Sequence, residues 1–267
     1  MRIKAMATIA KMSFLESTVY RTYFLLTIFS NAIYMVIMYF LWDAIFAGVD
    51  GGIINGMTFK QTFIYLALAG TISSIIVSFT EWNMSHDIQT GNVAVWFVRP
   101  ISYQSKLMSK AAGDIMTSFI IMFLPSFILV YFLSDGYIKL GVNIPLFLIA
   151  FIIAAAINIF IDFLIGILSF FTESVWGISI MKETVVMLLA GAVIPLAFFP
   201  EPIRTVLEFL PFQAIYNLPL QILTNTGYSA YDYISKLAIQ LFWLIILFLI
   251  TKLCYKKASR HIIVNGG

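Results

Sequence analysis

Long apolar stretches, separated by short polar segments, run through the whole sequence. A helix that crosses a membrane needs about 20 predominantly apolar residues. Stretches of this kind predict six transmembrane helices, at about residues 22–47, 61–80, 104–133, 144–170, 175–198 and 234–254. The expected fold is therefore an all-α integral membrane protein, with residues 1–267 forming a single transmembrane domain.

The composition supports the same class. The chain is 61% hydrophobic and only 11% charged, whereas soluble domains carry about 25% charged residues. Such a sequence has too little charge to cover a surface in water, which excludes an ordinary soluble domain. Disorder is excluded as well, because it requires low hydrophobicity and high net charge.

Lysine and arginine give the orientation of the predicted helices, because cytoplasmic loops of membrane proteins are enriched in these residues. If the N-terminus is cytoplasmic, 12 of the 16 basic residues lie on the cytoplasmic side. The four others are Lys60, Lys139, Arg204 and Lys236. The sequence therefore predicts that the N-terminus and the C-terminus are both cytoplasmic.

The segment before the first predicted span has helical periodicity. Its apolar residues recur at steps of three and four, at Ile3, Met6, Ala10 and Phe14. This spacing places them on one face of a helix. We expect residues 3–18 to form an amphipathic helix on the cytoplasmic membrane surface; a lead-in without membrane contact is the alternative.

The segment at residues 81–100, between the second and third predicted spans, is polar first and then apolar and aromatic. Gly91 and the pair Arg99-Pro100 interrupt it, because glycine permits unusual backbone conformations and proline ends a helix. A short helix that stops at Gly91 would present the following aromatic residues to a soluble partner. Anchoring of residues 93–98 among lipid headgroups explains the same pattern equally well.

Asp162 is the ionisable residue that the sequence places well inside a span, and Asn158 lies one helical turn before it. Such residues are costly in a membrane and are usually functional. The two side chains either form a polar point on a translocation path or satisfy a helix-packing contact. A stand-alone ion-coupled secondary transporter or channel that uses Asp162 is the alternative function, although the scarcity of such groups argues against it.

Prolines cluster between the fifth and sixth predicted spans, at Pro195, Pro200, Pro202, Pro211 and Pro219. Residues 200–211 still have an amphipathic helical pattern, and a second short apolar piece follows. The pair suits a re-entrant hairpin within residues 199–228 that dips into the outer leaflet. Irregular backbone at that depth must be covered by protein or line a cavity, which favours an outer gate; a surface loop without a gating role is the alternative.

Signatures of catalysis and metal binding are absent from the sequence. It has no Gly-x-x-x-x-Gly-Lys-Ser/Thr phosphate loop, no His-Glu-x-x-His zinc motif and no Gly-x-Ser-x-Gly elbow. One cysteine and two histidines do not suffice for a multi-cysteine or histidine-rich metal site. We therefore expect a chain without catalytic residues, metal, cofactor or nucleic-acid partner.

Three features together resemble the permease subunit of ABC type-2 exporters, in the six-span bacterial branch that is encoded with a separate ATPase. The first is the amphipathic helix before span one, and the second is the segment from Gly91 to Arg99-Pro100. The most specific is the run Gly191-Ala192-Val193-Ile194-Pro195-Leu196-Ala197-Phe198-Phe199-Pro200, followed by Leu210-Pro211-Phe212 and Tyr216-Asn217-Leu218-Pro219. The resemblance covers essentially the whole chain.

The resemblance implies partners that the composition alone does not give. Two permease chains, identical or paralogous, would work in the lipid bilayer of a bacterial plasma membrane with two ABC ATPase subunits. ATP and Mg²⁺ would be bound by those ATPases, and hydrolysis there would drive export. The substrate stays unidentified, although the 25 Phe and 12 Met residues suit a hydrophobic or amphiphilic cargo.

The resemblance also implies roles for particular residues. The N-terminal helix corresponds to an elbow helix, and residues 84–92 and 171–174 correspond to two coupling helices that touch the ATPase. The coupling residues implied are His86, Asp87, Ile88, Gln89, Thr90, Gly91, Arg99, Thr172 and Glu173. The outer gate implied comprises Pro195, Pro200, Pro211, Phe212 and Pro219.

Overall fold

The computed structural model describes residues 2–19, 21–49, 51–134, 136–172, 174–225 and 227–259. This part of the chain is helical almost throughout, with one short β-hairpin. Its elements are α1 (Arg2–Val19), α2 (Arg21–Ala47), β1 (Ile53–Ile54), β2 (Met57–Thr58), α3 (Phe59–Ile76), α4 (Thr80–Gln89), α5 (Val93–Phe97), α6 (Tyr103–Ser118), η1 (Phe119–Phe123), α7 (Leu124–Leu133), α8 (Asn143–Ile167), η2 (Leu168–Phe170), α9 (Trp176–Leu189), η3 (Leu196–Phe198), α10 (Glu201–Phe209), η4 (Pro211–Ala214), α11 (Asn217–Thr224) and α12 (Ala230–Ala258).

Local sequence explains where two of the long helices begin. The Thr58 hydroxyl accepts a hydrogen bond from the Gln61 backbone, and the Gln61 side chain accepts one from the Thr58 backbone. Ser229 and Asp232 form the same reciprocal pair at the start of α12. These capping boxes satisfy backbone donors that the first turn of a helix leaves unpaired.

Within the described residues, five helical stretches are long and apolar enough to cross a membrane. They are Leu25–Ala47, Phe59–Gln89, Tyr103–Leu133, Asn143–Phe170 and Ala230–Ala258. Each of them overlaps one of the six predicted spans.

The predicted span at 175–198 does not form a single helix. α9 has 14 residues, so it is about 21 Å long, which is shorter than the roughly 30 Å of a hydrocarbon core. Gly191 follows α9 with a φ of +82°, and Pro195 lacks a backbone donor. The stretch is mostly apolar, but these two residues interrupt the helix, and the described residues contain five candidate spans rather than six.

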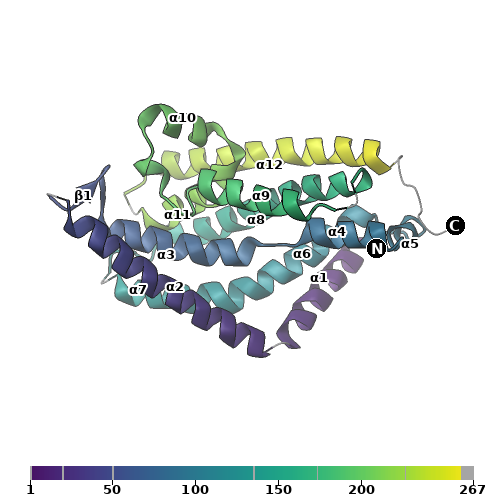
Figure 1. Cartoon of the computed structure of the whole chain (residues 1–267), viewed down its shortest axis with the longest axis horizontal. Coiled ribbons are helices and arrows are strands. Elements are labelled where there is room, and N and C mark those ends of the chain that lie inside the picture. The colour runs from purple at the N-terminus through teal and green to yellow at the C-terminus, as the bar shows by residue number, and fades with distance from the viewer. Residues whose placement is uncertain are drawn as a thin grey trace.

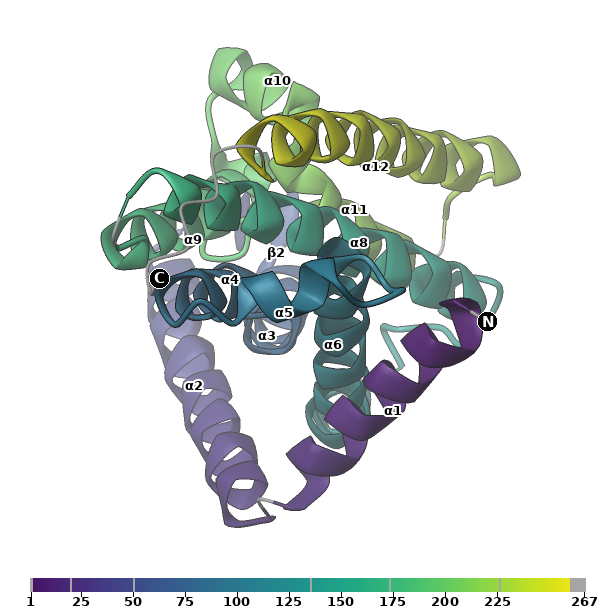
Figure 2. The same ribbon diagram turned by 90° about the vertical axis from the view of Figure 1, so that its right-hand side faces the viewer.

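Most of the helices run along the long axis of the molecule (Figure 1). One end, called here the α4 end, carries α4, α5 and the beginning of α1. The opposite end, called the hairpin end, carries β1, β2 and α10. Figure 2 looks onto the α4 end, where α4 and α5 lie in front and α1 runs down one side towards α2.

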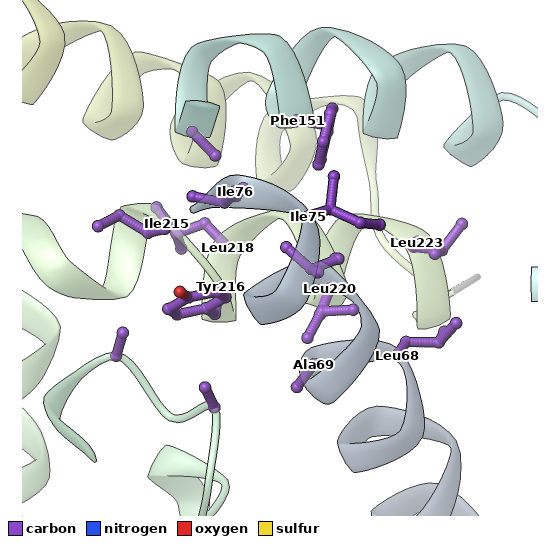
Figure 3. Packing of buried hydrophobic residues seen from close by; sticks show 14 of the residues in the cluster. Leu68, Ala69, Ile75, Ile76, Phe151, Ile215, Tyr216, Leu218, Leu220 and Leu223 are labelled. Carbon is purple, nitrogen blue, oxygen red and sulfur yellow. The ribbon is translucent and has the colours of Figure 1, made fainter. Parts of the chain in front are cut away.

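The core is centred on α11, which lies between α3 and α8 (Figure 3). Leu220 and Leu223 of α11 are fully buried, as are Ile75 and Ile76 of α3. Phe151 of α8 lies in the same hydrophobic cluster. Burial of these side chains holds the chain after α9 inside the helical bundle, although that segment is too short to cross a membrane.

α2 and α12 lie at the periphery and expose much of their apolar surface. Phe29 and Phe40 of α2 are each 65% exposed, and Leu253 of α12 is 68% exposed. Large apolar side chains in such numbers are costly in water but not in lipid. These two helices are therefore suited to contact lipid or another apolar helix.

α3 and α4 nearly form one helix, which the predicted boundary at residue 80 did not anticipate. The helix breaks only at residues 77–79, where Phe79 adopts a left-handed conformation with a φ of +46°. α4 then continues from Thr80 through the polar sequence, with Glu81 only 4% exposed. Polarity in the sequence indicated a segment outside the bundle, whereas α4 is packed along α8.

The apolar face of α1 is directed at protein rather than at lipid alone. Met6, Ala10 and Phe14 are half-buried, and α1 packs along α6. Ser13 donates a hydrogen bond to Asp114 of α6. Neither interpretation of the sequence included this contact, because periodicity shows that a face is apolar but not what covers it.

Gly113 of α6 permits the close approach of α1. A Cβ at this position would lie 2.3 Å from the Ala10 carbonyl oxygen. We expect Gly113→Ala to lower stability by about 1–3 kcal/mol through overpacking. Thermal unfolding of the purified variant measures this effect.

Gly177→Ala is the matched control, because nothing lies within 4 Å of a Cβ there. Alanine is favoured over glycine in helices by about 1 kcal/mol, so this control should be neutral or stabilising. Equal melting temperatures for the two variants would contradict the close packing of α1 on α6.

Candidate functional site

Three charged side chains meet where α3 breaks into α4. Lys182 of α9 places its Nζ 2.7 Å from Asp162 Oδ1 and 3.3 Å from Glu81 Oε1. The side chains of Asp162, Glu81 and Lys182 are 1%, 5% and 13% exposed. This group, called here the charge cluster, ties α4, α8 and α9 together.

Neutral groups complete the environment of Asp162. Ser78 Oγ donates to Asp162 Oδ2 over 2.5 Å, and Asn158 Nδ2 donates to the same oxygen over 3.0 Å. Asn158 also donates to the Ile76 carbonyl over 3.2 Å, which the helix break leaves without its usual partner. The structure therefore places Asn158 and Asp162 on one face of α8 and supplies their partners from the α3–α4 break and from α9.

Two carboxylates share one ammonium group in the charge cluster. No described residue donates a hydrogen bond to Glu81 Oε2, which is buried. A cavity of about 30 Å³ lies beside these side chains and is also lined by Tyr216, which gives room for one or two water molecules. Buried charges are costly unless they are paired. Because Glu81 lies on α4 and pairs with Lys182, this pairing stabilises the position of α4.

The residues expected for coupling between positions 86 and 91 lie on α4 or at its end, and those on α4 occupy two of its faces. Asp87 faces α6, where it accepts hydrogen bonds from Tyr103 Oη at 2.9 Å and from Lys106 Nζ at 2.6 Å. α4 ends at Gln89, and Gly91 follows with a φ of +72°. The remaining residues of this set, His86, Ile88 and Thr90, lie on the same short helix or at its end.

Residue 99 begins the return of the chain towards α6. The Arg99 guanidinium lies 4.3 Å from the centre of the Trp96 ring, a cation–π contact. The Lys106 ammonium lies 5.0 Å from the same ring. Together they give the α4 end a basic and aromatic surface.

A groove of about 250 Å³ separates α4 from the beginning of α9. Its lining comprises Trp82, Ser85, His86, Gln89, Ser174, Val175 and Trp176. Trp82 is 40% exposed and Trp176 is 58% exposed. The groove thus lies between the segment at residues 81–100 and residues 174–176, at the end of the second expected coupling segment. Thr172 lies next to it and donates to the Ser174 carbonyl over 3.3 Å, and Glu173 lies outside the described residues.

The prolines expected at the outer gate lie near the start of short elements at the hairpin end. Pro200 precedes α10, Pro211 begins η4 with Phe212 beside it, and Pro219 lies in the first turn of α11. Proline is favoured there, because the first helical positions need no backbone donor. Pro195 and Pro219 are buried, whereas Pro200 is exposed.

A family model for ABC-2 family transporter proteins matches residues 32–266, which is most of the chain. The chain belongs to the ABC-2 transporter family. This ABC-2 permease has several helices suited to cross a membrane. Proteins of its family are membrane components of transporters rather than enzymes. A comparison with curated proteins finds no match.

Asp162 of this ABC-2 permease was predicted from the sequence, whereas its charged partners were not. Lys182 lies inside the predicted span at 175–198, so the rule that drew attention to Asp162 applies to it equally. Glu81 had no such signal, because it begins a polar segment and only the fold buries it. Among the residues that the structure describes, no group of three or more His, Cys, Asp or Glu side chains is arranged to hold a metal ion.

Proposed function

We propose that this chain is the transmembrane subunit of an ABC exporter, with no catalytic site of its own. The groove between α4 and α9 carries the proposal, because it joins the two segments expected to contact an ATPase. Its paired tryptophans are the kind of residue that dominates protein–protein binding energy. ATP and Mg²⁺ belong to the partner subunits.

The proposed assembly contains two permease chains, identical or paralogous, and two ATPase subunits. The α4 end is assigned to the cytoplasm of a bacterial cell, together with both termini, because basic residues concentrate on that side of the predicted topology. α1 serves as the elbow helix, and α10 and α11 form the re-entrant outer segment. Crossing by α9 together with residues 190–198 gives the sixth span.

The charge cluster has a role in this proposal. An ATPase that pushes on α4 displaces Glu81, and Lys182 and Asp162 carry the displacement to α9 and α8 through hydrogen bonds of 2.7–3.3 Å. Export of a hydrophobic or amphiphilic substrate follows from that movement. Asp162 and Asn158 then act as part of this connection rather than as an ion site.

Purification of the tagged chain from its own membrane, after crosslinking, tests the proposal. We expect a stoichiometric ATPase to accompany it. Trp176→Ala should weaken that association by about 2 kcal/mol or more, which is roughly 30-fold in Kd. Tyr231→Ala is the control, because Tyr231 is an aromatic residue that is 78% exposed at the start of α12.

Recovery of the chain without any ATPase would contradict the exporter. Flux that depends on pH or sodium, needs no ATP and is lost in Asp162→Asn would then identify the ion-coupled alternative. Equal ATPase recovery with Trp176→Ala and Tyr231→Ala would keep the exporter but exclude the groove as its docking surface.

A further inference from the structure

A second pocket lies at the hairpin end and is formed entirely within one chain. Its volume is about 300 Å³, at the lower end of the range for small-molecule sites. Five segments line it: the β1–β2 turn, the start of α3, the α7–α8 connection, η3 with the residue before it, and α11 with the residues after it. None of the residues that line it belongs to the charge cluster or to the groove at the α4 end.

Amide and phenol groups line this pocket. Gln61 Nε2 donates to Tyr137 Oη over 2.9 Å, and Gln221 Nε2 donates to Asn217 Oδ1 over 3.1 Å. Tyr65 Oη also donates to Asn217 Oδ1, over 3.3 Å. Each amide has both donors and acceptors, so the wall presents polar groups of both kinds that hold one another in place.

The segment that begins at Gly191 shapes the same wall. A Cβ at Gly191 would lie 2.9 Å from Tyr65 Oη, so only glycine leaves the phenol free to reach Asn217. Pro195 and Leu196 then line the pocket beside it. The motif that resembled a gate in the sequence therefore also builds one side of a polar cavity.

The charge of the pocket restricts its ligand. Its described lining contains no Asp, Glu, Lys or Arg side chain. Lys236 lies behind the lining, with its Nζ 2.6 Å from Gln221 Oε1 and 4.8 Å from the centre of the Tyr228 ring. A positive charge there disfavours a cationic ligand, and one lysine already bonded to an amide does not make a phosphate site.

We propose that this pocket binds an uncharged, hydroxyl-rich ligand, a sugar ring or a polyol of similar size. Hydroxyl groups donate and accept at once, as the amides and phenols do, and the phenol rings offer flat surfaces to the ring of the ligand. The ligand reaches the pocket from outside the cell, a placement that rests on the proposed function. A free sugar and the headgroup of a glycolipid share this chemistry.

Saturation-transfer NMR on the full chain in phosphatidylcholine nanodiscs tests the proposal without an ATPase. Glucose, N-acetylglucosamine and myo-inositol are the free probes, a monoglucosyl diacylglycerol in the disc is the lipid probe, and choline and inorganic phosphate are the charged controls. We expect saturable binding of at least one uncharged probe. If the glycolipid displaces that signal, the pocket binds the lipid headgroup. If the signal persists, the pocket binds the free sugar.

Two variants locate the site. Tyr65→Phe removes one hydroxyl and should weaken binding roughly 2- to 10-fold, and Gln221→Leu should abolish it. Gln104→Leu, at the start of α6 and outside the lining of the pocket, is the control and should bind like the unaltered chain. If Gln221→Leu fails to fold, binding can still be measured with Tyr65→Phe, which is the smaller change.

Three outcomes would overturn the proposal: no saturable binding of any uncharged probe, equal binding by Tyr65→Phe and the unaltered chain, or binding of choline or phosphate as tight as that of the sugars. None of them depends on recovery of an ATPase. Failure of this proposal is therefore distinguishable from failure of the exporter assignment.

Discussion

Replacement of Lys182 by methionine should be among the most damaging single changes in the chain. It removes the ammonium group that lies 2.7 Å from Asp162 and 3.3 Å from Glu81, and it leaves two carboxylates in one buried site. Removal of one partner from a buried ion pair costs about 3–5 kcal/mol. We expect the variant to accumulate poorly in the membrane and to unfold at a lower temperature than the unaltered chain.

Rescue by further neutral substitutions separates a charge effect from loss of packing. Glu81→Gln and Asp162→Asn combined with Lys182→Met should recover much of the stability, because neutral replacement of a whole buried ion pair or triad is often tolerated. Arg204→Met is the control, since Arg204 and Glu208 form an exposed pair at 3.7 Å, and such pairs contribute about 0–1 kcal/mol. Equal losses in Lys182→Met and Arg204→Met would contradict a buried charge cluster.

Enlargement of Gly166 should uncouple the two ends of the molecule. A Cβ at Gly166 would lie 3.0 Å from Met84 Sδ and 3.1 Å from Glu81 Cα, so Gly166→Leu must push α4 away from α8. The groove residues stay unaltered, and ATP hydrolysis by the bound partner should continue. The response of the hairpin end to ATP should fall by about tenfold or more, a loss of over 1.4 kcal/mol in coupling.

Spin labels measure this response without knowledge of the substrate. Ile53 and Tyr231 are 56% and 78% exposed, and both can be replaced by cysteine once the single cysteine, Cys254, is changed to serine. ATP should alter the distance between the labels in the assembled transporter. Gly166→Leu should abolish that change, whereas Gly141→Leu, at an exposed glycine near the hairpin end, should preserve it. A preserved response in Gly166→Leu would exclude α4–α8 contact as the route of coupling.

The sequence was informative where one physical property dominates. Five long apolar stretches correspond to five helices that can cross a membrane, since a lipid environment demands apolar side chains and internally satisfied backbone groups. Capping pairs such as Thr58 with Gln61 mark helix starts because the contacts are local. Family membership followed from three features of the sequence, two of which lie within residues 32–266, the part of the chain that the family model matches.

Pattern alone failed where a distant partner decides the outcome. The sequence at 175–198 is mostly apolar, but Gly191 and Pro195 interrupt the helix. Glu81 was expected to lie in water, yet Lys182, which follows it by 101 positions, pairs with it inside the bundle. Neither composition nor periodicity contains such a pairing.

The sequence by itself determined that this protein lies in a membrane, that it is helical and that it belongs with ABC-2 permeases, because hydropathy and local motifs are properties of the chain. Only the tertiary structure decided which polar residues meet. It joined Glu81, Asp162 and Lys182 at a helix break, placed α4 beside α9, and enclosed an amide-lined pocket at the other end. Contacts between helices that are far apart in the chain depend on how all the helices pack together. They cannot be predicted from the sequence of any single helix.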